Sequence, residues 1–210
     1  MTIAVINYGV GNIHSALKAL RHFHDDVILT DSPAEISAAG AIVLPGVGAF
    51  AAGMEGLRTR NLIGTIRNFA ASKKPVLGIC LGAQMLLSKG FEYGEHEGLG
   101  IFPGIVEHFP VLAAGYKTPH IGWNTLQKME QASTPHILQG LTKDSMVYFV
   151  HSFIMKPANA ADTLATTEYG GCTFASVLHK ENIYGCQFHP EKSAHAGLKI
   201  IENFVSMALQ

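Results

Sequence analysis

The first half of the chain alternates between short apolar runs and segments with helical spacing. The apolar runs predict buried strands at residues 2–8, 27–30, 41–44 and 76–79. Helices are predicted at residues 12–23, 57–72 and 81–89, the first with Ile13, Ala16, Leu17 and Leu20 on one face. A further helix start lies at residues 32–35, where a capping serine precedes proline and a glutamate. This alternation predicts βαβ units and a parallel sheet.

The pattern changes after Gly90, where glycines, prolines and short β-like pieces replace the long helices. Residues 146–151 are predicted to form a strand, and residues 172–179 and 183–188 a hairpin. Ser193 is expected to cap a last helix with one apolar face. No repeat or linker interrupts the chain, so we expect one α/β domain, residues 1–210, with a mixed sheet.

Composition limits the classes of function. The 210 residues are 48% hydrophobic and 15% charged with a formal net charge of -1, which is typical of a globular chain. There is no basic stripe for nucleic acid, and no apolar run is long enough for a membrane span. The three cysteines form no CxxC pair and the first residues lack a signal-peptide pattern, so a cytoplasmic setting is expected.

Cys80 is the strongest candidate nucleophile. It lies between a predicted strand and a predicted helix and is flanked by Gly78 and Gly82, a cysteine counterpart of the Gly-x-Ser-x-Gly nucleophile elbow. The following helix amides favour an anion, and the Leu81 N–H is placed to donate to an oxyanion. A small buried cysteine at a strand end is the alternative interpretation.

A base for that nucleophile is predicted in the segment that contains His189, Pro190 and Glu191. Proline favours an extended conformation for the residue before it, and in an extended chain His189 and Glu191 point to the same side. The carboxylate would then orient the imidazole, which completes a Cys80–His189–Glu191 triad. The same alternation places Cys186 in the core, and Cys172 has no base nearby in the sequence.

Three other features suggest alternatives. The loop at residues 45–48 carries Gly46 and Gly48 and could supply a second oxyanion donor, although it also resembles part of a dinucleotide fingerprint. The first βα turn, with Asp31 after the second strand, resembles the same fingerprint, but His14 replaces its third glycine and no cofactor is expected. The histidine-rich residues 22–26 are interpreted as a solvated turn and not a metal site. Trp123, the single tryptophan, either belongs to the core or has a role at the surface.

Together, residues 78–84 and 187–191 resemble the motifs of class I glutamine amidotransferases. Within that group, residues 7–12, 45–48, 120–124, 148–152 and 189–193 resemble the glutaminase subunit of imidazole glycerol phosphate synthase. The resemblance departs at Ala83 and Phe153. It implies a single-domain, flavodoxin-like α/β fold with a mixed, mostly parallel central sheet flanked by helices.

The resemblance also implies a reaction and a partner. Glutamine would be hydrolysed through a thioester on Cys80, with Gly46, Gly48 and Gln84 binding glutamine and Leu81 and Val47 donating to the oxyanion. Ammonia would pass to a (β/α)₈-barrel cyclase subunit in a heterodimer that serves histidine biosynthesis.

For the partner surface we expect Trp123, Asn124 and Lys192. The alternatives are a glutaminase subunit for another acceptor, such as anthranilate synthase, a free-standing cysteine hydrolase, or a non-catalytic flavodoxin-like binding module.

Overall fold

A central mixed sheet organises the chain in a computed structural model, which describes residues 1–9, 11, 13–129 and 136–209. Its parallel half is, in spatial order, β2 (Val27–Thr30), β1 (Ile3–Ile6), β3 (Ala41–Leu44), β4 (Val76–Ile79) and β14 (Ile183–Cys186). The sheet continues through β13 (Cys172–Lys180), β11 (Phe153–Pro157), β7 (Phe102–His108), β5 (Leu87–Gly90) and β6 (His96–Glu97). Beside this path, β12 (Thr163–Tyr169) pairs with β13 and with β9 (Gln127–Lys128). The expected mixed sheet is confirmed.

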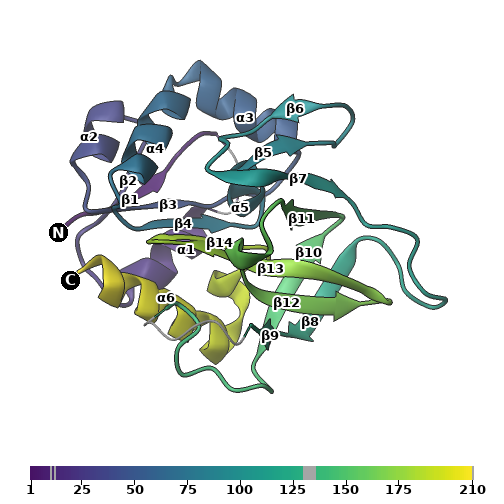
Figure 1. Cartoon of the computed structure of the whole chain (residues 1–210). Coiled ribbons are helices and arrows are strands. Elements are labelled where there is room, and N and C mark those ends of the chain that lie inside the picture. The colour runs from purple at the N-terminus through teal and green to yellow at the C-terminus, as the bar shows by residue number, and fades with distance from the viewer. Residues whose placement is uncertain (10, 12, 130–135, 210) are drawn as a thin grey trace.

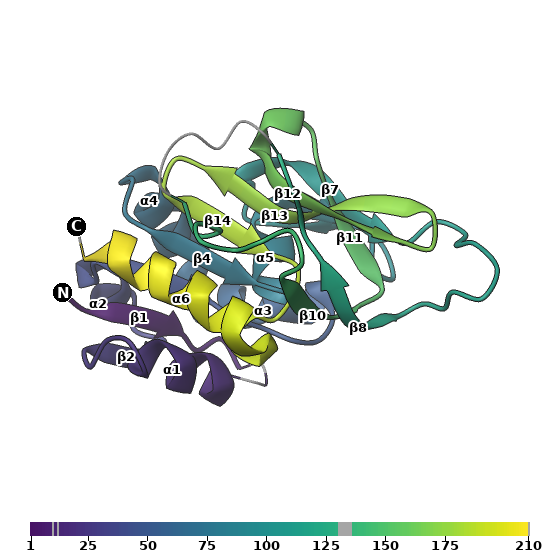
Figure 2. The same cartoon turned by 90° about the horizontal axis from the view of Figure 1, so that it is seen from below.

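Helices cover both faces of the parallel half (Figures 1 and 2). One face carries α1 (Ile13–Arg21) and α6 (Ala194–Ala208), and the other carries α2 (Pro33–Ala38), α3 (Phe50–Thr59) and α4 (Leu62–Ala71). The predicted apolar face of α1 is buried, because Ile13, Ala16, Leu17 and Leu20 join the core on that side of the sheet. No helix in the described part of the chain has the length and apolar character needed to cross a bilayer.

Two predicted helices are wrong in extent. Residues 57–72 do not form one helix, because Asn61 adopts a left-handed conformation with φ 57° and separates α3 from α4. Residues 81–89 form only the short helix α5 (Leu81–Met85), after which the chain turns into β5 and pairs in parallel with β7. Helix propensity is overruled there by strand pairing with residues farther along the chain.

The predicted strand at residues 146–151 and the predicted hairpin are confirmed. The strand is β10 (Met146–His151), which pairs antiparallel with β8 (His120–Thr125) in a separate two-stranded sheet. The hairpin consists of β13 and β14, and β14 also joins β4 in parallel. Strand β8 was not expected from the sequence, and it places Trp123 opposite Tyr148.

The fold brings four chain segments to one edge of the sheet. Strands β1, β3, β4 and β14 run parallel as neighbours, so their carboxyl ends meet at the same side. In open α/β sheets this edge is where ligands bind. The segments that follow these strands contain Tyr8, Gly46, Cys80 and His189.

Candidate active site

Cys80 occupies a strained turn between β4 and α5. Its backbone has φ 51° and ψ -108°, which side-chain-bearing residues rarely adopt, and strain of this kind is concentrated at functional sites. The flanking glycines permit the turn: a Cβ on Gly82 would lie 1.7 Å from the Leu44 carbonyl oxygen, and a Cβ on Gly78 would lie 2.8 Å from the Ala83 backbone. The structure therefore contains the elbow that the Gly-x-Cys-x-Gly pattern predicts.

The side chains of His189 and Glu191 meet after β14, as predicted, but the predicted reason is wrong: only His189 is extended, and residues Pro190–Lys192 form a short 3₁₀ helix that turns Glu191 back toward the imidazole. His189 is extended at φ -101° and ψ 93°, and its Nδ1 lies 2.8 Å from Glu191 Oε1. Both side chains are 1% exposed, so solvent screens this contact little. A carboxylate only accepts, so His189 carries a proton on Nδ1 in this contact, and its other ring nitrogen, Nε2, is left available for proton transfer.

The environment of His189 favours its charged form. Burial alone would lower the pKa of His189, but its interactions with Cys80 and Glu191 outweigh this effect and raise the pKa to about 9. A histidine held as imidazolium beside a cysteine is the pairing from which a thiolate nucleophile and a general acid arise together.

Ser193 fixes the backbone that carries His189. It is fully buried, its hydroxyl donates to the His189 carbonyl oxygen at 2.6 Å, and its Oγ accepts from the Tyr148 N–H at 2.9 Å. Ser193 occupies the N-cap position of α6, as expected, but its side chain makes no capping bond, because the hydroxyl is used between the start of η2 (Pro190–Lys192) and β10.

The loop after β3 reaches the nucleophile with a carbonyl group. The Leu81 N–H, the expected oxyanion donor, donates to the Gly46 carbonyl oxygen at 3.3 Å. The Val47 N–H belongs to the same trans peptide as that carbonyl and points the opposite way. Leu81 and Val47 therefore do not converge on one oxyanion in this arrangement, and the two donors would meet only after that peptide rotates.

Tyr8 supports the base of this loop. Its phenol is buried and donates to the Pro45 carbonyl oxygen at 2.7 Å. A Cβ on Gly46 would lie 2.0 Å from the Tyr8 hydroxyl, so only glycine fits there. Gly48, exposed with φ 114°, gives the other side of the loop its conformational freedom.

A cavity of about 600 Å³ opens beside Cys80, and its volume suits a small polar substrate. Val47, Gly48, Leu81 and Gln84 line it, together with Glu92, Tyr93, His108, Pro119, Val150, His151, Ser152 and Phe153. Gly46 lies behind this surface and not on it. Sequence reasoning gave residues 150–153 no place in this wall, although residues 148–152 belong to a motif that resembles the family and Phe153 to a position where the resemblance departs.

Two buried histidines extend the polar interior behind the cavity. His151 Nδ1 donates to the Phe153 carbonyl oxygen at 2.8 Å, since a carbonyl only accepts, and its Nε2 therefore accepts from His120 Nδ1 at 3.2 Å. Burial lowers the pKa of His120 to about 4 and that of His151 to about 3. Both rings are therefore neutral at physiological pH and serve as fixed hydrogen-bonding groups.

This pair predicts acid sensitivity of the fold. Between pH 6.5 and about 4 the unfolded chain binds protons at His120 and His151 that the folded chain does not bind. The free energy of unfolding should therefore fall with falling pH, by about 1.4 kcal/mol per pH unit for each histidine. His189 has the opposite sign: its raised pKa stabilises the fold fully below pH 6.5, and this stabilisation is lost as pH rises through about 9.

Denaturant unfolding at a series of pH values from 4 to 7.5 measures how steeply the free energy of unfolding changes with pH. A His120→Asn variant keeps an N–H donor toward His151 and should reduce the slope, whereas His22→Asn, at an exposed position, is the matched control. An unchanged slope in His120→Asn would contradict the assignment.

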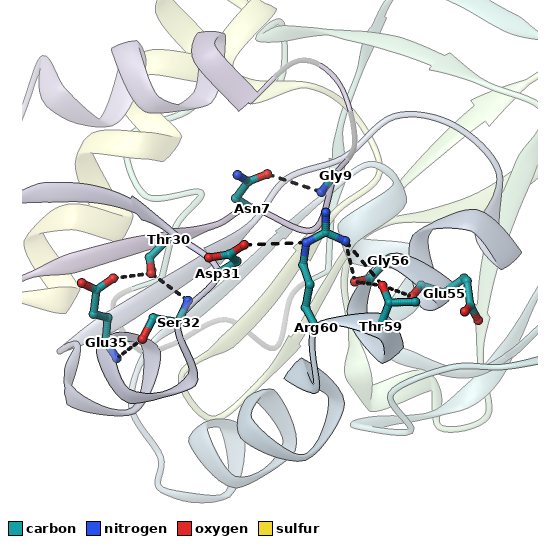
Figure 3. Close-up of polar contacts among 10 residues, drawn as sticks. All are labelled: Asn7, Gly9, Thr30, Asp31, Ser32, Glu35, Glu55, Gly56, Thr59 and Arg60. Carbon is teal, nitrogen blue, oxygen red and sulfur yellow. Dashed lines mark hydrogen bonds and ion pairs between the residues drawn. The ribbon is translucent and has the colours of Figure 1, made fainter.

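The first βα turn and the histidine-rich turn, which suggested other functions, make structural contacts. Asp31 Oδ2 lies 3.8 Å from Arg60 Nε, and the Arg60 guanidinium covers Gly9, as Figure 3 shows. The Ser32 side chain accepts from the Glu35 N–H, which confirms the predicted helix start. In the turn after α1, His24 bonds the Met1 carbonyl oxygen, and among the described residues no three metal-ligating side chains converge.

The residues expected at a partner surface differ in exposure. Trp123 is 47% exposed and Lys192 is exposed, so both are accessible. The Asn124 side chain instead donates to the Glu168 carbonyl oxygen at 2.9 Å and accepts from the Thr125 N–H at 2.8 Å. Asn124 therefore ties β8 to β12 in the isolated chain.

Comparison with known proteins gives consistent matches. Residues 4–208 match the family model "Glutamine amidotransferase class-I". The imidazole glycerol phosphate synthase subunit HisH 1 of Legionella pneumophila (strain Lens) is 47% identical over 211 residues, 98% of this chain and 99% of the relative. Subunit HisH of Salinibacter ruber is 44% identical over 207 residues, 97% and 93% of the two chains.

Solved structures share the fold. One described as a glutamine amidotransferase has a TM-score of 0.75 at 16% identity and covers 100% of both chains. Another, described as part of a putative GMP synthase from Thermoplasma acidophilum, has a TM-score of 0.72 at 22% identity, covering 100% of this chain and 94% of the other. At these identities the similarity establishes the fold alone, and it agrees with the α/β class predicted from the sequence.

Proposed function

We propose that this chain, which belongs to the class I glutamine amidotransferase family, is the glutaminase subunit of imidazole glycerol phosphate synthase and serves histidine biosynthesis. The observation that supports this most is the buried pair of His189 and Glu191 beside a strained Cys80 at the edge of the cavity. The near-full-length similarity to HisH subunits favours this acceptor over anthranilate synthase or another synthase.

The reaction follows from the placement of these groups. The Cys80 sulfur attacks the side-chain carbonyl carbon of glutamine, and the developing oxyanion needs N–H donors at the elbow. His189, as imidazolium, gives its Nε2 proton to the leaving nitrogen, so ammonia departs and a γ-glutamyl thioester remains. His189 then takes a proton from water, which attacks the thioester and releases glutamate and the free cysteine.

Gln84 is the best-placed side chain to hold the substrate. It is 6% exposed at the cavity wall, and both hydrogens of its amide are used by the Phe153 carbonyl oxygen and Gln187 Oε1. Its own Oε1 remains as an acceptor for the ammonium group of glutamine. Gly48 borders the same cavity, and Gly46 contributes through the loop backbone.

Ammonia is consumed on another chain, because the described residues form one amidotransferase fold and contain no barrel. We place the (β/α)₈-barrel cyclase on the outer face of the β8–β10 sheet, where Ile121, Trp123 and Met146 are exposed, and near Lys192. Exposed aromatic and aliphatic side chains of this kind are typical of an interface core. The three cysteines are free thiols, which fits a reducing cytoplasm.

The oxyanion loop provides a means of regulating the glutaminase. With the Gly46 carbonyl on the Leu81 N–H, the chain is in a resting state of low activity. Rotation of the Gly46–Val47 peptide replaces that carbonyl with the Val47 N–H and completes the oxyanion hole. The loss of one such donor costs about 10²–10³ in rate, which is a useful range for a switch.

Steady-state glutaminase kinetics of the chain alone, with cyclase, and with cyclase plus acceptor ligand test both proposals. We expect little activity in the first state and the highest kcat in the third. No glutamine hydrolysis in any state would refute the function, and equal kcat in all three would refute the switch alone.

A Val47→Pro variant tests the rotating peptide directly. Proline has no N–H, so the fully activated complex should lose about 10²–10³ in kcat, while the low activity of the isolated chain changes little. Val47→Ala keeps the N–H and is the matched control. If Val47→Pro responds to partner and ligand like the wild type, another donor completes the oxyanion hole.

A further inference from the structure

Gln187 is a fully buried amide directly behind the nucleophile. It lies between β14 and His189, with 0% exposure, and its backbone N–H donates to the Ser176 carbonyl oxygen. Its side chain contacts two groups of the site: Oε1 accepts from Gln84 Nε2 at 3.1 Å, and Nε2 lies 3.9 Å from Cys80 Sγ. A buried amide is costly unless it is hydrogen-bonded, so its orientation has consequences for both partners.

The direction of these hydrogen bonds is fixed by a backbone group. The Phe153 carbonyl oxygen can only accept, so Gln84 must present its NH₂ group there, at 3.2 Å. The second hydrogen of that NH₂ group needs an acceptor, and Gln187 Oε1 supplies it. With Oε1 so used, the NH₂ group of Gln187 must face the Cys80 sulfur. The opposite orientation would set two NH₂ groups against each other and a carbonyl oxygen against the sulfur.

We propose that Gln187 is a positioning residue of the glutaminase reaction, an inference that rests on the proposed function. It holds the Gln84 amide so that Oε1 faces glutamine, and it donates an N–H to the Cys80 sulfur, which favours the thiolate. Gln187 thereby acts both on the binding of glutamine and on the ionisation of the Cys80 thiol.

Other titratable groups also face Cys80. His189 approaches it from the segment after β14, with Glu191 behind it, and Tyr8 approaches from the end of β1. On the cavity wall lie Glu92, Tyr93, His108 and His151. The contribution of Gln187 must therefore be measured as a difference between variants in which all these groups are retained.

Two variants separate the effects of Gln187. Gln187→Met keeps the length of the side chain and removes both hydrogen bonds. Gln187→Glu keeps an acceptor for Gln84 but sets a carboxyl oxygen against the sulfur. Gln127→Met, at an exposed site on β9, is the matched control, and thermal unfolding checks that each variant folds.

The first measurement is the rate of Cys80 alkylation by iodoacetamide as a function of pH. A Cys172→Ser background removes the half-buried thiol, and Cys186 is fully buried, with its pKa raised by that burial. Loss of a hydrogen bond to an anion should move the pH midpoint of alkylation upward by about one unit in Gln187→Met, and farther in Gln187→Glu. An unchanged midpoint in both variants would overturn the thiolate role.

The second measurement is glutaminase kinetics in the complex with cyclase. Gln187→Met should raise KM for glutamine roughly tenfold through Gln84, and Gln187→Glu should raise it less while it lowers kcat more. The double variant Gln84→Met/Gln187→Met should have a KM close to that of Gln84→Met alone, because Gln187 acts on glutamine through Gln84.

Additive effects in the double variant would overturn the positioning role. Failure of the proposed function is distinguishable, because the wild-type complex would then show no glutamine hydrolysis to compare.

Discussion

Replacing Cys80 with alanine is expected to abolish glutamine hydrolysis while synthesis from added ammonium salts survives in the complex with cyclase. The cysteine sulfur is the only atom of the elbow that can form the thioester, so glutaminase activity should fall by at least about 10⁴-fold. In the proposed function the acceptor chemistry is on the partner chain and needs only ammonia. Both rates are measured on the same purified complex, with glutamine in one assay and an ammonium salt in the other.

The variant is expected to fold, because alanine has the same backbone constraints at φ 51° as the cysteine it replaces. Cys186→Ala, at a neighbouring buried thiol on β14, is the control and should retain glutaminase activity. Retained hydrolysis in Cys80→Ala would remove the sulfur from its proposed role. Loss of both activities would instead indicate a damaged complex, which the thermal unfolding of the variant would reveal.

The geometry of the candidate triad could be predicted because each half of it is encoded locally. Gly78 and Gly82 flank Cys80 and specify a turn that only close-packed glycines allow. The short spacing from His189 to Glu191 keeps their side chains within reach of each other, although a 3₁₀ turn from Pro190, and not an extended segment, brings them together. Their meeting depends on β14 lying beside β4 in parallel, which the strand pattern alone does not state. The proximity of Cys80 to His189 was therefore predicted from the presence of both motifs in one chain.

The features that sequence reasoning missed depend on contacts between distant residues. Residues 87–90 have helix-forming neighbours but become a strand because β7 pairs with them. Strand β8 contains Gly122 at φ 140°, an unusual conformation within a strand, and pairs along its length with β10. The hydrogen bond between Gln84 and Gln187 joins residues 103 positions apart, and neither position suggests the other. Ser193 likewise resembles a helix cap and is used to hold His189.

A second large effect is expected from His189→Ala. In the proposed reaction the imidazole is both the proton donor to ammonia and the partner that stabilises the Cys80 thiolate, so its loss should lower kcat for glutamine hydrolysis nearly as much as loss of the cysteine. Ammonia-dependent synthesis should again survive. Glu191→Gln should be milder, because an amide oxygen still accepts the Nδ1–H at the position of Glu191 Oε1 but stabilises imidazolium less.

The double variant Cys80→Ala/His189→Ala tests whether the two residues act as one unit. Residues of a single catalytic unit are strongly non-additive, so the double variant should be little worse than either single variant. Residual glutamine hydrolysis of the three variants is compared under the activating conditions, with His195→Ala as a control at an exposed histidine on α6. Independent contributions would instead multiply the two losses. That result would mean that His189 assists the reaction by some route other than proton exchange with Cys80, and the buried contact with Glu191 would then need a purely structural explanation.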